Sequence, residues 1–239
     1  MARPGGIVIA SERFWAYAGV DGSLLEGTTP TPPPALRLPL LRGLARLGLA
    51  LSPLFRRRGV VRPVERALIA AALLVPFAFF VLPDRVQLAA GLSVTALLLA
   101  WMFRGRTLRL HGAEHRAIAA AESHSLLATW TGAARPSRFA LRCGTNFAAL
   151  VLPVATVAER LWPLPTAAYT PALVAVLSLA LTMELWLAIE RSRRRLARAF
   201  LLPGLGLQRL TTREPSLDET RIALTAAASV LRRELEPAD

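Results

Sequence analysis

Four long apolar runs dominate the pattern of hydrophobic and polar positions along the chain. They cover residues 67–82, 86–103, 146–161 and 167–189. Each run is near the roughly 20 residues that a helix needs to cross a bilayer. Pro76 and Pro153 interrupt two of them, which is tolerable where neighbouring helices satisfy the freed carbonyls. The pattern predicts an all-α integral membrane fold with about four transmembrane helices.

Arginines are distributed unevenly between the segments that connect these runs. They gather before 67–82, after 86–103 and after 167–189, whereas the two opposite connections hold only Arg85 and Arg160, each beside an acid. Basic residues are enriched in the cytoplasmic loops of membrane proteins. We therefore expect a multi-pass protein of the plasma membrane, with both termini and the central loop in the cytoplasm.

The N-terminal region has a different, alternating pattern. Asp21-Gly22 is typical of a two-residue hairpin turn, and residues 7–11, 14–19 and 23–26 fit short strands around it. The sequence thus predicts a small N-terminal β-hairpin, followed by a proline-rich linker that ends at residue 39.

Three further helices are predicted outside the long apolar runs. Leucines at three- and four-residue spacing from Leu40 to Phe55 indicate an amphipathic helix, which either lies on the cytoplasmic leaflet or packs against the spans. A second helix is expected over about 108–127. A third begins after Pro215, where Ser216 and Glu219 have the spacing of a capping box.

These elements predict six consecutive segments. They are an N-terminal cytoplasmic segment (1–39), a basic amphipathic helix (40–66), a first transmembrane pair (67–103), a cytoplasmic loop (104–145), a second transmembrane pair (146–190) and a cytoplasmic C-terminal segment (191–239).

Composition and charge support the membrane interpretation. Hydrophobic residues make up 54% of the 239 residues, and the formal net charge is +13. Because the positive charge lies in loops next to the apolar runs, anionic lipid accounts for it. We expect a lipid bilayer as partner and no nucleic acid. With a single cysteine, Cys143, the chain forms no disulfide within itself.

The residues best suited to catalysis or metal binding lie between the two expected transmembrane pairs. His111, Gly112, Glu114 and His115 belong to an H-x-x-E-H motif, the inverted form of a zinc-protease motif. Two histidines four residues apart on a helix face the same side and can hold one ion, while the glutamate acts on a water molecule. The motif predicts a divalent metal, zinc first, with Glu114 as the catalytic base.

Further ligands must come from other positions. Glu122 follows on the same helix, and Glu184 is an acid inside the fourth run, where it binds either the metal or an arginine of a neighbouring helix. Cys143 precedes the third run, where a helix N-terminus favours a reactive thiolate. It is therefore a candidate ligand or nucleophile, or else a small packing residue.

Three blocks of the sequence resemble one family. They are Arg109-Leu-His-Gly-Ala-Glu-His-Arg-Ala-Ile, Arg142-Cys-Gly-Thr-Asn-Phe and Leu202-Pro-Gly-Leu-Gly-Leu-Gln-Arg-Leu-Thr-Thr-Arg-Glu-Pro. In order and spacing they are similar to the YqhQ-like family of uncharacterised bacterial membrane proteins, which are labelled predicted metal-dependent enzymes. The chain departs from that pattern at Ala140-Leu141, where the family has His-Pro, and at Ala121, where it has tyrosine.

Three functions are compatible with these features. The first is a metal-dependent, hydrolytic enzyme at the cytoplasmic face, with His111, His115 and Glu184 as ligands. The alternative is a non-catalytic scaffold that docks a soluble protein partner through residues 202–215. A small transporter ranks last, because four spans with one intramembrane acid offer little polar lining unless the chain forms oligomers.

Overall fold

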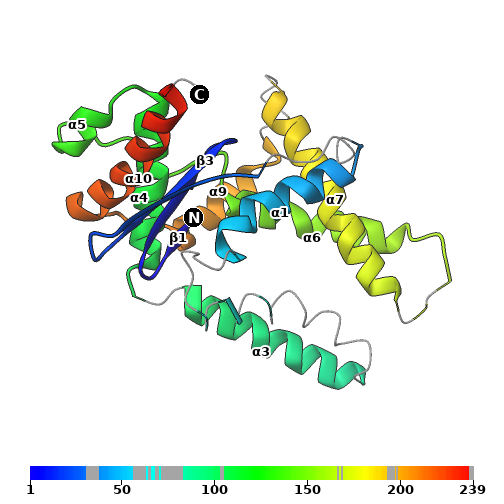
Figure 1. The fold of residues 1–239 in the computed structure, drawn as a ribbon. Coiled ribbons are helices and arrows are strands. Elements are labelled where there is room, and N and C mark those ends of the chain that lie inside the picture. The colour runs from blue at the N-terminus through cyan, green and yellow to red at the C-terminus, as the bar shows by residue number, and fades with distance from the viewer. Residues whose placement is uncertain are drawn as a thin grey trace. The chain divides into compact units, whose positions relative to one another are not determined.

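A computed structural model describes residues 1–30, 38–55, 63, 66–67, 70, 83–102, 105–165, 167, 169–192, 197 and 199–236. The chain divides into two compact units, which we describe separately. The sheet unit comprises Met1–Thr31, Met102–Cys143 and Leu205–Asp239. The helical unit comprises Pro32–Trp101 and Gly144–Gly204. Figure 1 labels their elements.

The sheet unit contains a four-stranded antiparallel sheet in the order β1-β2-β3-β4. Its strands are β1 (Ala2–Arg3), β2 (Gly6–Ala10), β3 (Phe14–Gly19) and β4 (Leu24–Thr28). Ile7 pairs with Ala18 and Ile9 with Ala16, so these side chains share one face. The turn at Asp21-Gly22 is present as expected, with a φ of +83° at Gly22. Strand β1 was not predicted from the sequence.

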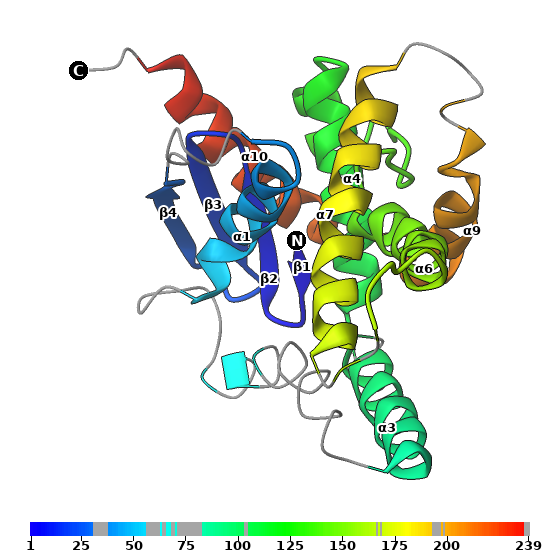
Figure 2. The same cartoon turned by 90° about the vertical axis from the view of Figure 1, so that its right-hand side faces the viewer.

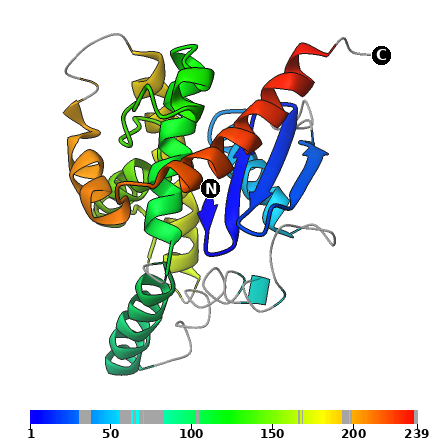
Figure 3. The same ribbon diagram turned by 90° about the vertical axis from the view of Figure 1, so that its left-hand side faces the viewer.

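Three described helices lie wholly in the sheet unit: α4 (Thr107–Glu122), α5 (Leu126–Trp130) and α10 (Leu217–Leu235). Helices α4 and α10 pack against each other and on the sheet, with α10 crossing the strands (Figure 3). Their contact is rich in alanine, which lets the two backbones approach closely. The main core cluster comprises Ile7, Leu110, Ala113, Ala117, Ala120, Ala223, Leu224 and Ala227.

Local sequence explains where these two helices begin and end. Helix α10 begins with the expected capping box, in which Ser216 and Glu219 each accept a backbone N–H of the other. Helix α4 ends at Glu122, earlier than the predicted 127. His124 adopts a φ of +54°, and the Ser125 N–H donates to the Ala120 carbonyl at 2.8 Å. This is a Schellman motif, which terminates the helix.

The helical unit is built around α7 (Thr170–Arg191), with α1 (Leu41–Phe55), α3 (Asp84–Met102) and α6 (Gly144–Arg160). Helices α1 and α6 both pack against α7 (Figure 2). A Cβ on Gly43 would lie 2.7 Å from the Met183 Cβ, so α1 approaches α7 closely. Of the two alternatives for α1, packing against another helix is the one observed. Helix α9 (Leu202–Thr211) begins in this unit, and its residues from Leu205 onward belong to the sheet unit.

The predicted all-α, four-span membrane fold is wrong. A four-stranded sheet forms part of a compact unit, and among the described residues one helical stretch, Thr170–Ile189, is long and apolar enough to cross a membrane. Helix α6 has 17 residues and ends in Glu159-Arg160, so it is shorter than a typical span. Most of the first expected span, 67–82, lies outside the described residues. The described part of the chain therefore does not support a multi-pass plasma-membrane localisation.

Candidate metal centre

Helix α4 presents two histidines on one face. His111 and His115 are four residues apart, and their ring centroids lie 4.4 Å from each other at an interplanar angle of 66°. The core-facing side of the same helix carries fully buried Leu110 and Ala113. Because this apolar side fixes the rotation of α4 in the sheet unit, it also fixes the direction in which the imidazoles point.

Cys143 joins the two histidines from a distant part of the sequence. Its Sγ lies 3.5 Å from Nε2 of His111. One ligand atom from each of the three residues lies within 4.8 Å of the other two. His115 and Cys143 are 3% exposed, so this cluster of side chains, the His-His-Cys cluster, is largely removed from solvent.

Backbone carbonyls orient both imidazole rings. Nδ1 of His111 lies 2.9 Å from the Thr211 carbonyl oxygen, and Nδ1 of His115 lies 2.7 Å from that of Arg138. A carbonyl oxygen only accepts, so each Nδ1 must carry the proton that it donates. A neutral ring then has its lone pair on Nε2. Metal-binding histidines are typically held in this way, with the second nitrogen bonded to a backbone carbonyl or carboxylate.

The cluster therefore could bind a metal ion. Zinc binds nitrogen at about 2.0–2.1 Å and sulfur at about 2.3 Å, which places tetrahedral ligands about 3.3–3.8 Å apart. The contact between Cys143 and His111 already falls in this range. Two imidazoles and a thiolate suit zinc, and a site with three protein ligands keeps a fourth position for water or substrate.

The segment that carries Thr211 is anchored to the same helix. The Arg213 N–H donates to the Leu108 carbonyl at 2.9 Å, and a Cβ on Gly112 would lie 2.3 Å from the Arg213 carbonyl oxygen. Glycine within the motif is thus explained by the close approach of another backbone. Residues 211–213 form one wall of the candidate site.

Glu114 lies beside the histidines but outside their cluster. Its Oε1 accepts from the Met1 amino group at 2.6 Å, while its Oε2 is buried and has no hydrogen-bond partner in the described structure. Burial raises the pKa of Glu114, but nearby positive charge, chiefly the Met1 ammonium, outweighs burial. The pKa therefore lies below its ordinary value, and the carboxylate is ionised at neutral pH.

The structure places the two other expected ligands elsewhere. Glu122 is 62% exposed and faces Arg142 at 3.8 Å. Glu184 belongs to the helical unit, where it pairs with the Arg42 guanidinium and accepts the Leu40 N–H at 3.1 Å. This is the arginine-pairing alternative for Glu184. Neither acid belongs to the cluster found among the described residues.

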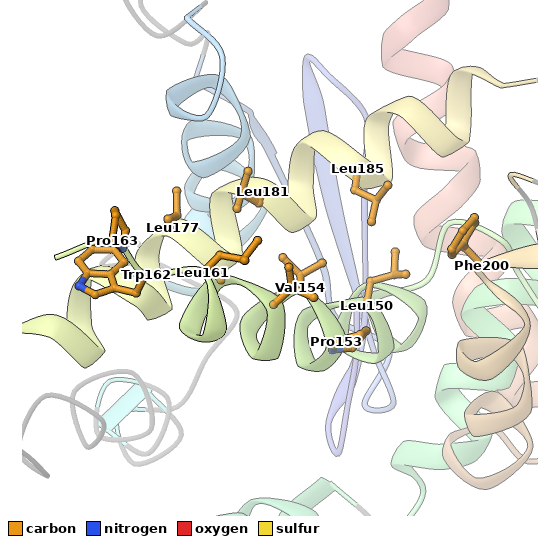
Figure 4. Close-up of a pocket in the computed structure, with 12 residues that line it drawn as sticks. Leu150, Pro153, Val154, Leu161, Trp162, Pro163, Leu177, Leu181, Leu185 and Phe200 are labelled. Carbon is orange, nitrogen blue, oxygen red and sulfur yellow. The ribbon is translucent and has the colours of Figure 1, made fainter. Parts of the chain in front are cut away.

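The helical unit contains a pocket with an apolar lining. It has a volume of about 530 Å³ and lies between α6 and α7. Figure 4 shows leucine, proline and valine side chains along its walls, with Phe200 at one end and Trp162 at the other. The described residues that line it include no ionisable side chain. The cluster that could hold a metal among the described residues lies in the sheet unit.

In the sheet unit, a small antiparallel sheet thus packs against a helix that carries the two histidines of a candidate metal centre. A family model described as a protein of unknown function, DUF1385, matches residues 68–233. The match covers more than half of the chain, which therefore belongs to this family. It includes the His-His-Cys cluster and excludes the strands. No curated protein and no solved structure gives a significant match.

Proposed function

We propose that the protein binds one divalent transition-metal ion, zinc first, through Nε2 of His111, Nε2 of His115 and Sγ of Cys143, and that it catalyses a hydrolytic reaction there. The observation that carries this proposal is the pair of bonds from the Nδ1 atoms to the carbonyls of Thr211 and Arg138. These bonds leave both Nε2 lone pairs available beside a buried thiol.

When bound, a zinc ion supplies Lewis-acid polarisation of an oxygen ligand. The protein's own groups would then position and deprotonate the attacking water. Glu114 is the proton acceptor in this proposal, because its Oε2 is buried and without a partner in the described structure. An unpartnered carboxylate oxygen can accept a hydrogen bond from a water molecule and then take its proton.

Metal content tests the binding half of the proposal. Full-length protein is purified in detergent, loaded with zinc, desalted and analysed by plasma mass spectrometry. We expect about one zinc per wild-type chain, and at least a tenfold loss of affinity in Cys143→Ala and in His111→Ala/His115→Ala, because each removes a ligand. Glu122→Gln is the matched control, since it changes a neighbouring exposed carboxylate.

Glu114→Gln separates binding from chemistry. The amide keeps the size of the side chain but cannot accept a proton as a base, so we expect near-normal zinc content together with loss of any hydrolytic activity found in a substrate screen. Zinc binding by wild type and by both cluster variants alike would contradict the proposed ligands.

The contact between Cys143 and His111 supports a second candidate. The Cys143 thiol lies 3.5 Å from the His111 imidazole, and the Thr211 carbonyl orients that ring. Cysteine enzymes use the same arrangement of a nucleophile, a base and a group that orients the base. In a metal-free cysteine enzyme, His111→Ala should slow alkylation of Cys143 by iodoacetamide, and zinc should not protect the thiol. In the metal proposal, zinc protects Cys143 in the wild type, and His111→Ala weakens that protection.

A further inference from the structure

A second pocket in the sheet unit has a polar lining that the metal proposal does not use. Its volume is about 210 Å³, and it lies at the N-terminus of α10. Arg116, Thr129, Arg135 and Glu214 contribute polar groups to its wall, together with Ser216 at the start of the helix. None of these residues belongs to the His-His-Cys cluster.

The beginning of α10 supplies backbone donors to this pocket, and the two acids of its first turn, Asp218 and Glu219, are each paired with an arginine. The helix has 19 residues, and its first N–H groups point away from the helix body. Ser216 Oγ accepts the Glu219 N–H at 3.2 Å, whereas the N–H groups of Leu217 and Asp218 have no acceptor in the described structure. Helix N-termini with free N–H groups are typical binding sites for phosphate and other anions.

Two arginines add formal positive charge. Arg116 is 7% exposed and donates to the Pro136 carbonyl at 3.0 Å and to Glu214 at 2.7 Å. Arg135 is exposed and has no ion-pair partner among the described residues. Glu214, the single acid of the lining, is 58% exposed and is already shared by Arg116 and Arg138. The lining as a whole therefore favours an anion.

A buried hydroxyl in the same lining lacks a partner. Thr129 is 1% exposed, and its Oγ1 makes no hydrogen bond in the described structure. Leaving a buried polar group unsatisfied is costly, so such groups nearly always have a ligand, water or protein partner. The neighbouring Thr220 hydroxyl already donates to the Ser216 carbonyl at 2.8 Å. The Thr129 hydroxyl is therefore available to donate to an incoming oxygen.

We propose that this pocket binds a phosphate group, either inorganic phosphate or the terminal phosphate of a small monoester. Arg135 and Arg116 provide charge, the N–H group of Leu217 provides a backbone donor, and Thr129 provides a hydroxyl. The volume is below the roughly 300–1,000 Å³ typical of pockets for drug-sized ligands, which limits the substituent on the phosphate to a few atoms. The site is independent of the metal proposal, because it shares no residue with the His-His-Cys cluster.

Calorimetric titration of the full-length, detergent-purified protein with inorganic phosphate, at constant ionic strength, tests the proposal. We expect one site, with about tenfold weaker binding in Arg135→Gln, since one charge-assisted contact is lost. Arg209→Gln is the matched control. It makes the same charge change at an exposed position of α9 and should leave the affinity unchanged.

Thr129 variants test the hydroxyl. Thr129→Val keeps the shape of the side chain and removes the donor, so it should weaken phosphate binding without lowering the melting temperature. Thr129→Ser restores the hydroxyl and should restore most of the affinity. If Thr129→Val fails to fold, Arg135→Gln still decides the question, because Arg135 lies at the surface.

Two further titrations identify the ligand and exclude the metal. Tighter binding of glycerol 3-phosphate than of inorganic phosphate would assign a monoester, and equal binding would assign free phosphate. Chelator-treated protein should bind phosphate as well as untreated protein does. The proposal is overturned if phosphate does not bind, if Arg135→Gln and Arg209→Gln weaken binding equally, or if chelation abolishes it.

Discussion

The two units differ in what they bury. The sheet unit buries ionisable side chains and holds them with groups from distant segments: Glu219 is 2% exposed and meets Arg106 and Arg109, and His115 bonds to the Arg138 carbonyl. In the helical unit, buried Ser178 and Thr182 donate to carbonyls one turn earlier in α7 itself. Glu184, an acid of the same helix, is 20% exposed and pairs with Arg42.

The sheet unit therefore holds ionisable side chains in fixed positions, whereas the helical unit is formed mainly by the packing of apolar helices. A buried ionisable group is costly unless its partners are fixed, so a unit that contains several depends on exact contacts between distant segments. Apolar helix packing tolerates substitutions better if volume is kept. We therefore expect equivalent substitutions to affect the sheet unit more strongly than the helical unit.

Among these substitutions, Gly112→Ala is expected to lower the free energy of unfolding the most. The new Cβ would lie 2.3 Å from the Arg213 carbonyl oxygen, so the backbone wall of residues 211–213 must move. We expect a loss of about 2–3 kcal/mol in the free energy of unfolding, as for overpacked cores, together with weaker zinc binding because Thr211 orients His111. Thermal melting and zinc titration measure the two effects.

Gly48→Ala is the matched control in the helical unit. Gly48 lies in α1, and a Cβ added there would have no described atom within 4 Å, so alanine should stabilise the helix by up to about 1 kcal/mol. Equal destabilisation by the two substitutions would remove the proposed difference between the units.

Local features of the sheet unit could be predicted well from the sequence. Strand β3 has the predicted bounds 14–19, and the capping box of α10 is present. Each depends on neighbouring residues, on alternation in the strand and on a three-residue spacing in the cap. The spacing of His111 and His115 likewise follows from helix geometry alone.

The rest depended on contacts that a sequence pattern does not encode. An apolar helix that packs against another helix has a hydrophobic pattern similar to that of a helix facing lipid, so the pattern of α6, which packs against α7, also fits a span. The carbonyls of Thr211 and Arg138 orient the imidazoles, yet a carbonyl belongs to every residue and leaves no signal. For the same reason, no sequence pattern indicates that residues 211–213 form a wall of the site.

Glu219→Gln is expected to cause the second largest loss in the free energy of unfolding. The carboxylate accepts from Arg106 and Arg109 at 3.1 Å and from the Ser216 N–H at 3.0 Å, and the amide cannot replace these charge-assisted bonds. We expect a loss of about 2 kcal/mol at neutral pH, measured by chemical unfolding. A loss confined to the few tenths of a kcal/mol typical of surface sites would contradict this role.

The same variant should change the response to acid. Burial raises the pKa of Glu219, but bonds to Ser216 and Arg106 and the charge of Arg109 outweigh burial and leave the pKa below its ordinary value of 4.5. The folded protein then binds fewer protons than the unfolded chain, so this contribution is present above pH 4.5 and is lost as pH falls below it. The wild type should lose stability there more steeply than Glu219→Gln.

A smaller effect is expected from Ser216→Ala, which removes the side-chain cap of α10. Loss of an N-cap typically costs about 1 kcal/mol. Helix α7 provides the comparison, because its N-cap Tyr169 makes no side-chain cap bond. Tyr169→Ala should change the free energy of unfolding by less than about 0.5 kcal/mol. A larger effect at Tyr169 than at Ser216 would reverse the expected order.

The smallest effect is expected from Glu184→Gln, which tests whether the two units are chemically separate. The pair with Arg42 is partly exposed, at 20% and 36%, so its loss should cost only about 0.5–1 kcal/mol. Zinc content should remain that of the wild type, because the candidate ligands all lie in the sheet unit. If Glu184→Gln instead lost zinc, as Cys143→Ala is expected to, Glu184 would be a metal ligand, which is one of its two alternatives from the sequence. The metal site would then not be confined to the sheet unit.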